Sequence, residues 1–81
     1  MHMVTVRYFA AAAEASGVDS EALAAASLSE LRAAMVAAHG ADLERVLTRC
    51  SILVDGRRLD DDRAALVDGD VADVLPPFAG G

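Results

Sequence analysis

Val71-Ala72-Asp73-Val74-Leu75-Pro76-Pro77-Phe78-Ala79-Gly80-Gly81 is the stretch of sequence that decides the fold. Its first part, residues 71–75, is an apolar run that predicts a final strand with Ala72 and Val74 on one face. Pro76-Pro77 must end that strand, because proline fixes φ and lacks an amide donor. The residues after the strand are therefore predicted to extend from the body as a tail, which reaches roughly 20 Å over residues 76–81 at full extension.

The tail ends on two glycines, Gly80 and Gly81. Glycine has no Cβ, so this end can pass a narrow channel and leave the Gly81 carboxylate open to attack from any side. A lone Gly-Gly end is usually a frayed terminus without function, but here it directly follows a predicted strand and a diproline. We therefore interpret residues 76–81 as a substrate or carrier arm. Phe78, an aromatic residue outside the folded body, is predicted to contact a partner.

The length of 81 residues predicts one domain with a small core and little room for an enclosed active site. We assign residues 3–75 to the folded body and residues 76–81 to the tail. Met1 and His2 stand ahead of a second methionine and are interpreted as residues left by an expression vector.

The net charge is −6, and all seven basic residues are arginines. Such an acidic chain is repelled by phosphate backbones and anionic lipids, which argues against nucleic acid and membrane surfaces as partners. The single cysteine, Cys50, cannot form an internal disulfide, which favours a reducing compartment. The expected location is therefore the cytoplasm.

Residues 4–9 alternate between apolar and polar side chains, which predicts a first strand. One face carries Val4, Val6 and Tyr8, and the other carries Thr5, Arg7 and Phe9.

The main helix is predicted to begin at a capping box, in which Ser27 accepts from the N3 amide and Glu30 bonds the Ser27 amide in return. It is predicted to end at His39-Gly40, and Asp42 is predicted to cap a further helical turn. The side chains expected to face inward are Leu28, Leu31, Met35 and Ala38.

Shorter elements complete the predicted body. They are a helix over residues 10–16, a weak edge strand over 21–24, a hairpin of residues 50–54 and 57–59 around Asp55-Gly56, and a turn at 68–70. We expect one sheet, with the first and last strands near its centre and the main helix across one face. The other face, which includes Thr5, Arg7, Asp73 and Leu75, is expected to stay open to a partner.

With these elements placed, the chain resembles the ubiquitin-like β-grasp sulfur carriers, and in particular the MoaD family, the small subunit of molybdopterin synthase. The resemblance is carried by Val-Arg-Tyr-Phe-Ala-Ala-Ala (6–12), Leu-Ser-Glu-Leu (28–31), Asp-Gly-Asp (68–70) and, most specifically, Val-Leu-Pro-Pro-Phe-Ala-Gly-Gly (74–81). It implies an α+β fold of the ubiquitin-like β-grasp type. In that fold a mixed sheet of four to five strands packs on one main helix and a flexible tail follows.

The resemblance also implies chemistry at Gly81. In such carriers an E1-like enzyme uses Mg-ATP to adenylate the terminal carboxylate, and a sulfur donor then converts it to a thiocarboxylate. The tail would enter the large subunit of molybdopterin synthase and deliver sulfur to cyclic pyranopterin monophosphate. The chain itself would be a non-catalytic carrier subunit that binds no cofactor or metal, with ATP consumed by the activating enzyme. The residues expected to contact the partner are Arg7, Leu75, Pro76, Pro77, Phe78, Ala79 and Gly80.

Other candidate groups favour structural interpretations. Cys50 opens an apolar strand without a nearby histidine, so a small core residue is favoured over a nucleophile. His39 at a helix C-terminus favours capping over catalysis. Residues 60–62 are three aspartates on a turn, where consecutive carboxylates point in different directions and do not make a metal site.

Three classes of function stay open: a sulfur carrier, a ubiquitin-like protein modifier and a non-covalent binding module. Among sulfur carriers, those for thiazole or cysteine synthesis share the Gly-Gly end. The Leu-Pro-Pro-Phe-Ala-Gly-Gly ending and the chain length favour molybdopterin synthesis.

Overall fold

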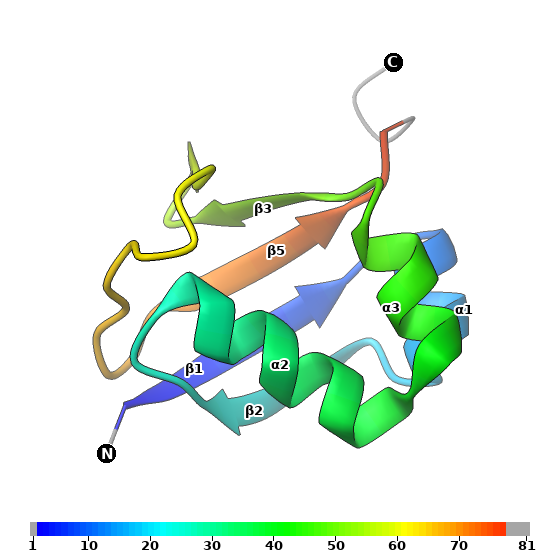
Figure 1. Ribbon diagram of the computed structural model, residues 1–81, viewed down its shortest axis with the longest axis horizontal. Helices are drawn as coiled ribbons and strands as arrows, with labels where there is room; N and C mark the ends of the chain where they lie inside the picture. Colours follow the sequence, from blue (N-terminus) through cyan, green and yellow to red (C-terminus); the bar gives the residue numbers. More distant parts are fainter. Residues whose placement is uncertain (1, 78–81) are drawn as a thin grey trace.

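The computed structural model describes residues 2–77, which form one sheet accompanied by helices (Figure 1). Phe78, Ala79, Gly80 and Gly81 lie outside the described residues, so the predictions for them stay predictions. In chain order the elements are β1 (Met3–Tyr8), α1 (Ala11–Ser16), β2 (Ser20–Ala24), α2 (Leu28–His39), α3 (Ala41–Leu47), β3 (Ser51–Val54), β4 (Arg57–Arg58) and β5 (Val71–Leu75).

The strands form one mixed sheet in the order β2-β1-β5-β3-β4. β1 and β5 pair in parallel, and the other neighbours pair antiparallel. A parallel pair needs a long connection, and here residues 9–70 supply it and carry α2 across one face of the sheet. The expected sheet of four to five strands on one main helix, with the first and last strands near its centre, is confirmed.

The core lies between α2 and the inner face of the sheet. The predicted alternation is confirmed, because every second residue of β1 and β5 is buried. The buried residues from the sheet and α2 are Val4, Val6, Tyr8, Leu28, Leu31, Met35, Ile52, Val54, Ala72 and Val74. Burying each large aliphatic side chain contributes about 1.5–3 kcal/mol, so these positions hold the domain together.

The inward stripe of α2 differs from the prediction at its last turn. Ala38 is exposed, so its assignment to the core was wrong. The stripe continues instead from Leu31 to Met35 to His39, at steps of four residues, and the His39 side chain is largely buried.

The capping box at the start of α2 is present with one change of partner. Ser27 Oγ accepts from the Glu30 amide at 3.2 Å, as predicted. Glu30 Oε1 accepts from the amide of Ala26 at 3.0 Å, whereas the prediction named the Ser27 amide. The reason is that residues 64–66 pair with residues 26–28 and hold them extended, which brings the Ala26 amide within reach of Glu30.

The junction between α2 and α3 also differs from the prediction. Gly40 has φ 88°, a conformation that favours glycine, and it both ends α2 and precedes α3. Asp42 therefore lies inside the first turn of α3 and pairs with Arg45, so the prediction that Asp42 is the cap was wrong. Its carboxylate still interacts favourably with the positive end of the helix.

The remaining short elements are confirmed with small shifts of their ends. β2 is the predicted edge strand, and α1 ends at Gly17 in the left-handed conformation. At the β3–β4 hairpin, Asp55 and Gly56 have φ values of 51° and 81°, which match a two-residue type I′ turn.

Candidate functional site

The candidate site is the open face of the sheet together with the base of the tail at the end of β5. Strand alternation places Arg7 and Leu75 on this face, because their neighbours in each strand point into the core. The face expected from the sequence is therefore confirmed. The binding roles of the two residues stay predictions.

An ion pair lies in the middle of the open face. Arg7 and Asp73 are register partners in the parallel β1–β5 pair. Arg7 donates from Nε to Asp73 Oδ1 at 2.5 Å and from Nη2 to Oδ2 at 2.8 Å. These hydrogen bonds raise the pKa of Arg7 above its ordinary value. The pair fixes the orientation of the guanidinium plane, which a single hydrogen bond would not do.

The base of the tail follows directly from β5. Leu75 is half-buried and lies opposite Ser51 of β3. The strand ends at Leu75, so the prediction that the diproline terminates it is confirmed. Pro76 is half-buried, whereas Pro77 is exposed.

Pro76 and Pro77 form one wall of an open surface groove of about 790 Å³. The other walls come from α1 and α3, which lie side by side at this end of the sheet. Charged side chains of both signs line the groove, among them Glu14, Arg45 and Arg49. The tail thus begins beside a groove that is lined by both charged and apolar side chains.

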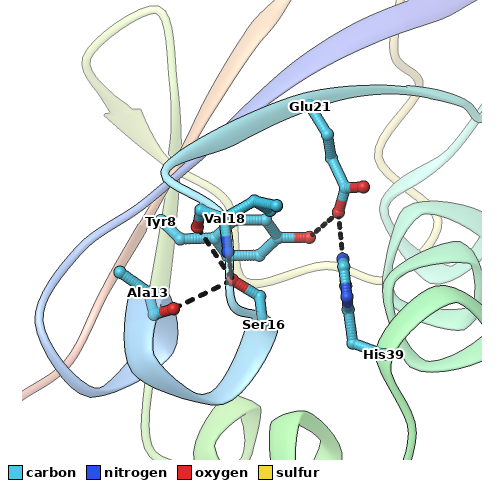
Figure 2. Close-up of polar contacts among 6 residues, drawn as sticks. All are labelled: Tyr8, Ala13, Ser16, Val18, Glu21 and His39. Atoms are coloured by element: carbon cyan, nitrogen blue, oxygen red, sulfur yellow. Dashed lines mark hydrogen bonds and ion pairs between the residues drawn. The ribbon is translucent and has the colours of Figure 1, made fainter.

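A second polar cluster lies on the opposite face, where β1, β2 and α2 meet. Tyr8 Oη donates to Glu21 Oε2 at 2.6 Å, and His39 Nε2 contacts the same carboxylate oxygen. The Tyr8 and His39 rings meet edge to face with their centroids 5.8 Å apart. Figure 2 shows the Glu21 carboxylate joining the two rings. The interpretation of His39 as a helix cap is therefore corrected, because its ring contacts Tyr8 and Glu21.

The electrostatics of this cluster favour a charged Glu21. Burial alone would raise the pKa of Glu21, but the hydrogen bond from Tyr8 and the contact with His39 outweigh it and lower the pKa. Burial, together with the bond to Glu21, raises the pKa of Tyr8. The tyrosine hydroxyl therefore stays a hydrogen-bond donor at all ordinary pH values.

Sequence reasoning missed this cluster, although one signal was present. Tyr8 was predicted to face the core, and a buried tyrosine hydroxyl requires a hydrogen-bond partner. Glu21 is half-buried between exposed residues of β2, so it faces the core. Its carboxylate is therefore placed to accept a hydrogen bond from the Tyr8 hydroxyl.

Cys50 does not have the surroundings of a reactive cysteine. It is half-buried and packs against the core, as its structural interpretation predicted. Burial raises the pKa of its thiol, and nearby Arg32 opposes this only in part. A raised pKa disfavours the thiolate, which is the nucleophilic form.

Asp60 precedes a turn at residues 62–63, which is closed by the Ala64 amide donating to the Asp61 carbonyl at 2.9 Å. Asp61 Oδ1 accepts from the Arg63 amide at 2.9 Å, and Asp62 lies 3.4 Å from Arg32 Nε. Within residues 2–77, no three metal-ligating side chains gather into a possible site. In the same part of the chain, no helix has the length and apolar character needed to cross a membrane.

Comparison with known proteins adds a family match. The model of the ThiS family matches residues 6–81. A search of curated proteins returned no match.

Several solved structures are similar along nearly their whole length. A chain described as molybdopterin converting factor subunit 1 from Pyrococcus furiosus is 27% identical, with a TM-score of 0.81 over 96% of this chain and 100% of that one. A chain from the complex of subunits 1 and 2 of molybdopterin-converting factor from Helicobacter pylori is 33% identical, with a TM-score of 0.73 over 98% and 99%. SAMP1 from Haloferax volcanii is 26% identical, with a TM-score of 0.82 over 98% and 99%. These similarities confirm the ubiquitin-like β-grasp fold.

Proposed function

The chain belongs to the ThiS family, and from that premise we propose that it is the sulfur-carrier subunit of a molybdopterin synthase. The observation that carries the proposal is its 33% identity, over 98% of its length, to a chain from the Helicobacter pylori complex of subunits 1 and 2. The Pyrococcus furiosus similarity supports the same pathway. The free Cys50 is compatible with the reducing cytoplasm, where we propose that the chain acts.

The proposed chemistry takes place at Gly81, and the family match extends to this residue. A terminal carboxylate has a pKa of about 3.5 and is therefore ionised at neutral pH. Its oxygen would attack the α-phosphorus of ATP on an E1-like enzyme, with pyrophosphate leaving, to give an acyl-adenylate. Sulfide from a sulfur donor would then attack the acyl carbon and displace AMP, which leaves a thiocarboxylate. The folded body contributes recognition to these steps, while the activating enzyme supplies the catalytic groups.

The proposed docking surface combines the open face and the tail. A tail of six residues alone offers far less than the roughly 800 Å² per partner of a standard interface. The open face adds the area around Arg7 and Leu75, next to the point where the tail begins. We propose that the second subunit binds this face and that residues 76–81 enter its active site, with Phe78, Ala79 and Gly80 lining the path to Gly81.

A protein modifier is the second candidate, and the similarity to SAMP1 favours it. A modifier would form an amide bond between Gly81 and an amine of another protein. The chain has no lysine, so a copy of it offers no lysine side chain as an acceptor. Carriers for thiazole or cysteine synthesis would use the same Gly81 chemistry with a different sulfur acceptor.

Binding to purified candidate partners tests the pathway. The chain would be titrated with subunit 2 of molybdopterin-converting factor, thiazole synthase and cysteine synthase, each from the source organism of the chain. We expect the tightest complex with subunit 2, and molybdopterin formation when the thiocarboxylated chain and cyclic pyranopterin monophosphate are added. Preferential binding to either of the other enzymes, with no product from the subunit 2 mixture, would refute the assignment.

A further inference from the structure

The Arg7–Asp73 pair has apolar neighbours. Leu53 of β3 is the register partner of Asp73, and Val71 and Leu75 flank Asp73 on the same face of β5. These three side chains are half-buried. The ion pair is therefore set among apolar side chains in the middle of the sheet.

The stability of the domain does not explain why an ion pair is present at these two positions. The Arg7 side chain is 52% exposed, and the Asp73 side chain is 23% exposed. Ion pairs with this access to water contribute little to folding because water and salt screen the charges, although the two parallel hydrogen bonds make this pair stronger than a single contact would be. Two apolar side chains at the same register positions would pack equally well against the surrounding leucines and valine.

The hydrogen-bonding capacity of Arg7 limits what can cover this face. A guanidinium group has five N–H donors, and the described contacts to Asp73 use two of them. A partner that covers the face removes water from the other donors. A charged donor without an acceptor in a buried interface is costly, so a purely apolar surface would bind poorly.

We propose that Arg7, held in place by Asp73, is a specificity-determining residue that selects a partner surface with an acceptor oxygen opposite the guanidinium and apolar side chains around it. The acceptor is a carboxylate or main-chain carbonyl oxygen of the second subunit. This inference rests on the proposed function, because it takes the open face as the docking surface for that subunit.

Asp73 is a positioning residue in this arrangement. Its two oxygens fix the plane of the guanidinium, which directs the free donors toward the partner. Lysine in place of Arg7 would keep the charge but would not make the two parallel hydrogen bonds. The geometry of the arginine, and not its charge alone, is expected to determine affinity.

A double-mutant cycle with purified subunit 2 of molybdopterin-converting factor tests both roles. The variants are Arg7→Met, Arg7→Lys, Asp73→Ala and the double variant Arg7→Met/Asp73→Ala, with affinities measured by calorimetry. Arg63→Met is the matched control, because it removes the same charge from an exposed position in the turn at residues 62–63. Circular dichroism checks folding, and Asp73→Asn replaces Asp73→Ala if the latter does not fold.

We expect Arg7→Met to weaken binding by about tenfold or more, and Arg7→Lys to restore little of the loss. Asp73→Ala should weaken binding in the wild-type background but should change it less than about twofold when Arg7 is already methionine. Arg63→Met should bind like the wild type. The proposal is overturned if Arg7→Met binds as tightly as the wild type, or if Asp73→Ala has the same effect in both backgrounds.

The wild-type titration separates this inference from the proposed function. If the wild-type chain does not bind subunit 2, the proposed partner is wrong, and the inference falls with it. If the wild type binds and the Arg7 variants bind equally well, only the inference fails.

Discussion

Arg7 and Tyr8 are neighbours in β1, yet their side chains lie on opposite faces of the sheet and make polar contacts of different kinds. Tyr8 is 3% exposed and joins β1 to β2 and α2 through Glu21 and His39. Arg7 is about half exposed, and its only described side-chain partner is Asp73 on the adjacent strand. The inner contact links elements that must pack for the domain to fold. The outer contact links two strands that already pair, which leaves it available for recognition.

This comparison predicts that changes on the inner face reduce stability and that changes on the open face reduce partner binding. The largest effect is expected from Leu31→Ala, because Leu31 is fully buried between α2 and the sheet. Loss of its side chain should lower the free energy of unfolding by about 2–5 kcal/mol. Urea denaturation followed by circular dichroism measures this change. A loss below about 1 kcal/mol would contradict the assignment of the core.

The next largest effect is expected from Leu75→Glu on the open face. This change should reduce binding to the second subunit. A carboxylate at this half-buried position would be desolvated by the second subunit, so affinity should fall by about thirtyfold, or ~2 kcal/mol. Val67→Glu is the matched control, because it makes a similar change at a side chain that is 60% exposed and outside the strands. Equal binding by both variants would exclude the open face from the interface.

The cluster of Tyr8, Glu21 and His39 should contribute to the free energy of unfolding in a way that depends on pH. The pKa of Glu21 is lowered in the folded state, so its contribution is present above the unfolded pKa of about 4.3 and is lost as the pH falls through the folded value. Glu21→Gln should therefore lower stability by about 1–2 kcal/mol at pH 7. The difference from the wild type should shrink as the pH falls below the unfolded pKa. Urea denaturation between neutral and acid pH measures it, and a constant difference would contradict this account.

The smallest effect on stability is expected from Arg7→Met. Its ion pair with Asp73 is accessible to water and salt, so the melting temperature should change by only a few degrees. Thermal denaturation at low and high salt measures the change. A loss of stability as large as that of Leu31→Ala would show that the two faces do not differ in the way described.

The sequence predicted the parts of the fold that depend on local chemistry. Alternation in residues 4–9 and 71–75 predicted which side chains lie on each face of the sheet. Ser27 predicted the start of α2, and Asp55-Gly56 predicted the β3–β4 hairpin. Each of these signals acts over a few residues, through side-chain direction, a cap or a turn conformation. Such signals do not depend on how distant segments pack.

Apart from the Asp42–Arg45 pair within α3, the contacts that sequence reasoning missed depend on packing between distant segments. Glu21 and His39 are 18 positions apart and meet only because α2 crosses β2. The same packing buries the His39 side chain at the last turn of α2, where Ala38 was predicted to face the core. The open face was predicted, but the pairing of Arg7 with Asp73 depends on the parallel register of β1 and β5, which periodicity alone does not set.

The central claim is that Gly81 carries sulfur, and intact-protein mass spectrometry tests it most directly. The chain would be incubated with its E1-like enzyme, Mg-ATP and a sulfur donor, and the C-terminal peptide would then be sequenced. We predict a mass increase equal to the replacement of one oxygen by one sulfur, located at Gly81 and absent without ATP. An unchanged mass with an active E1-like enzyme, or sulfur located at Cys50, would contradict the account.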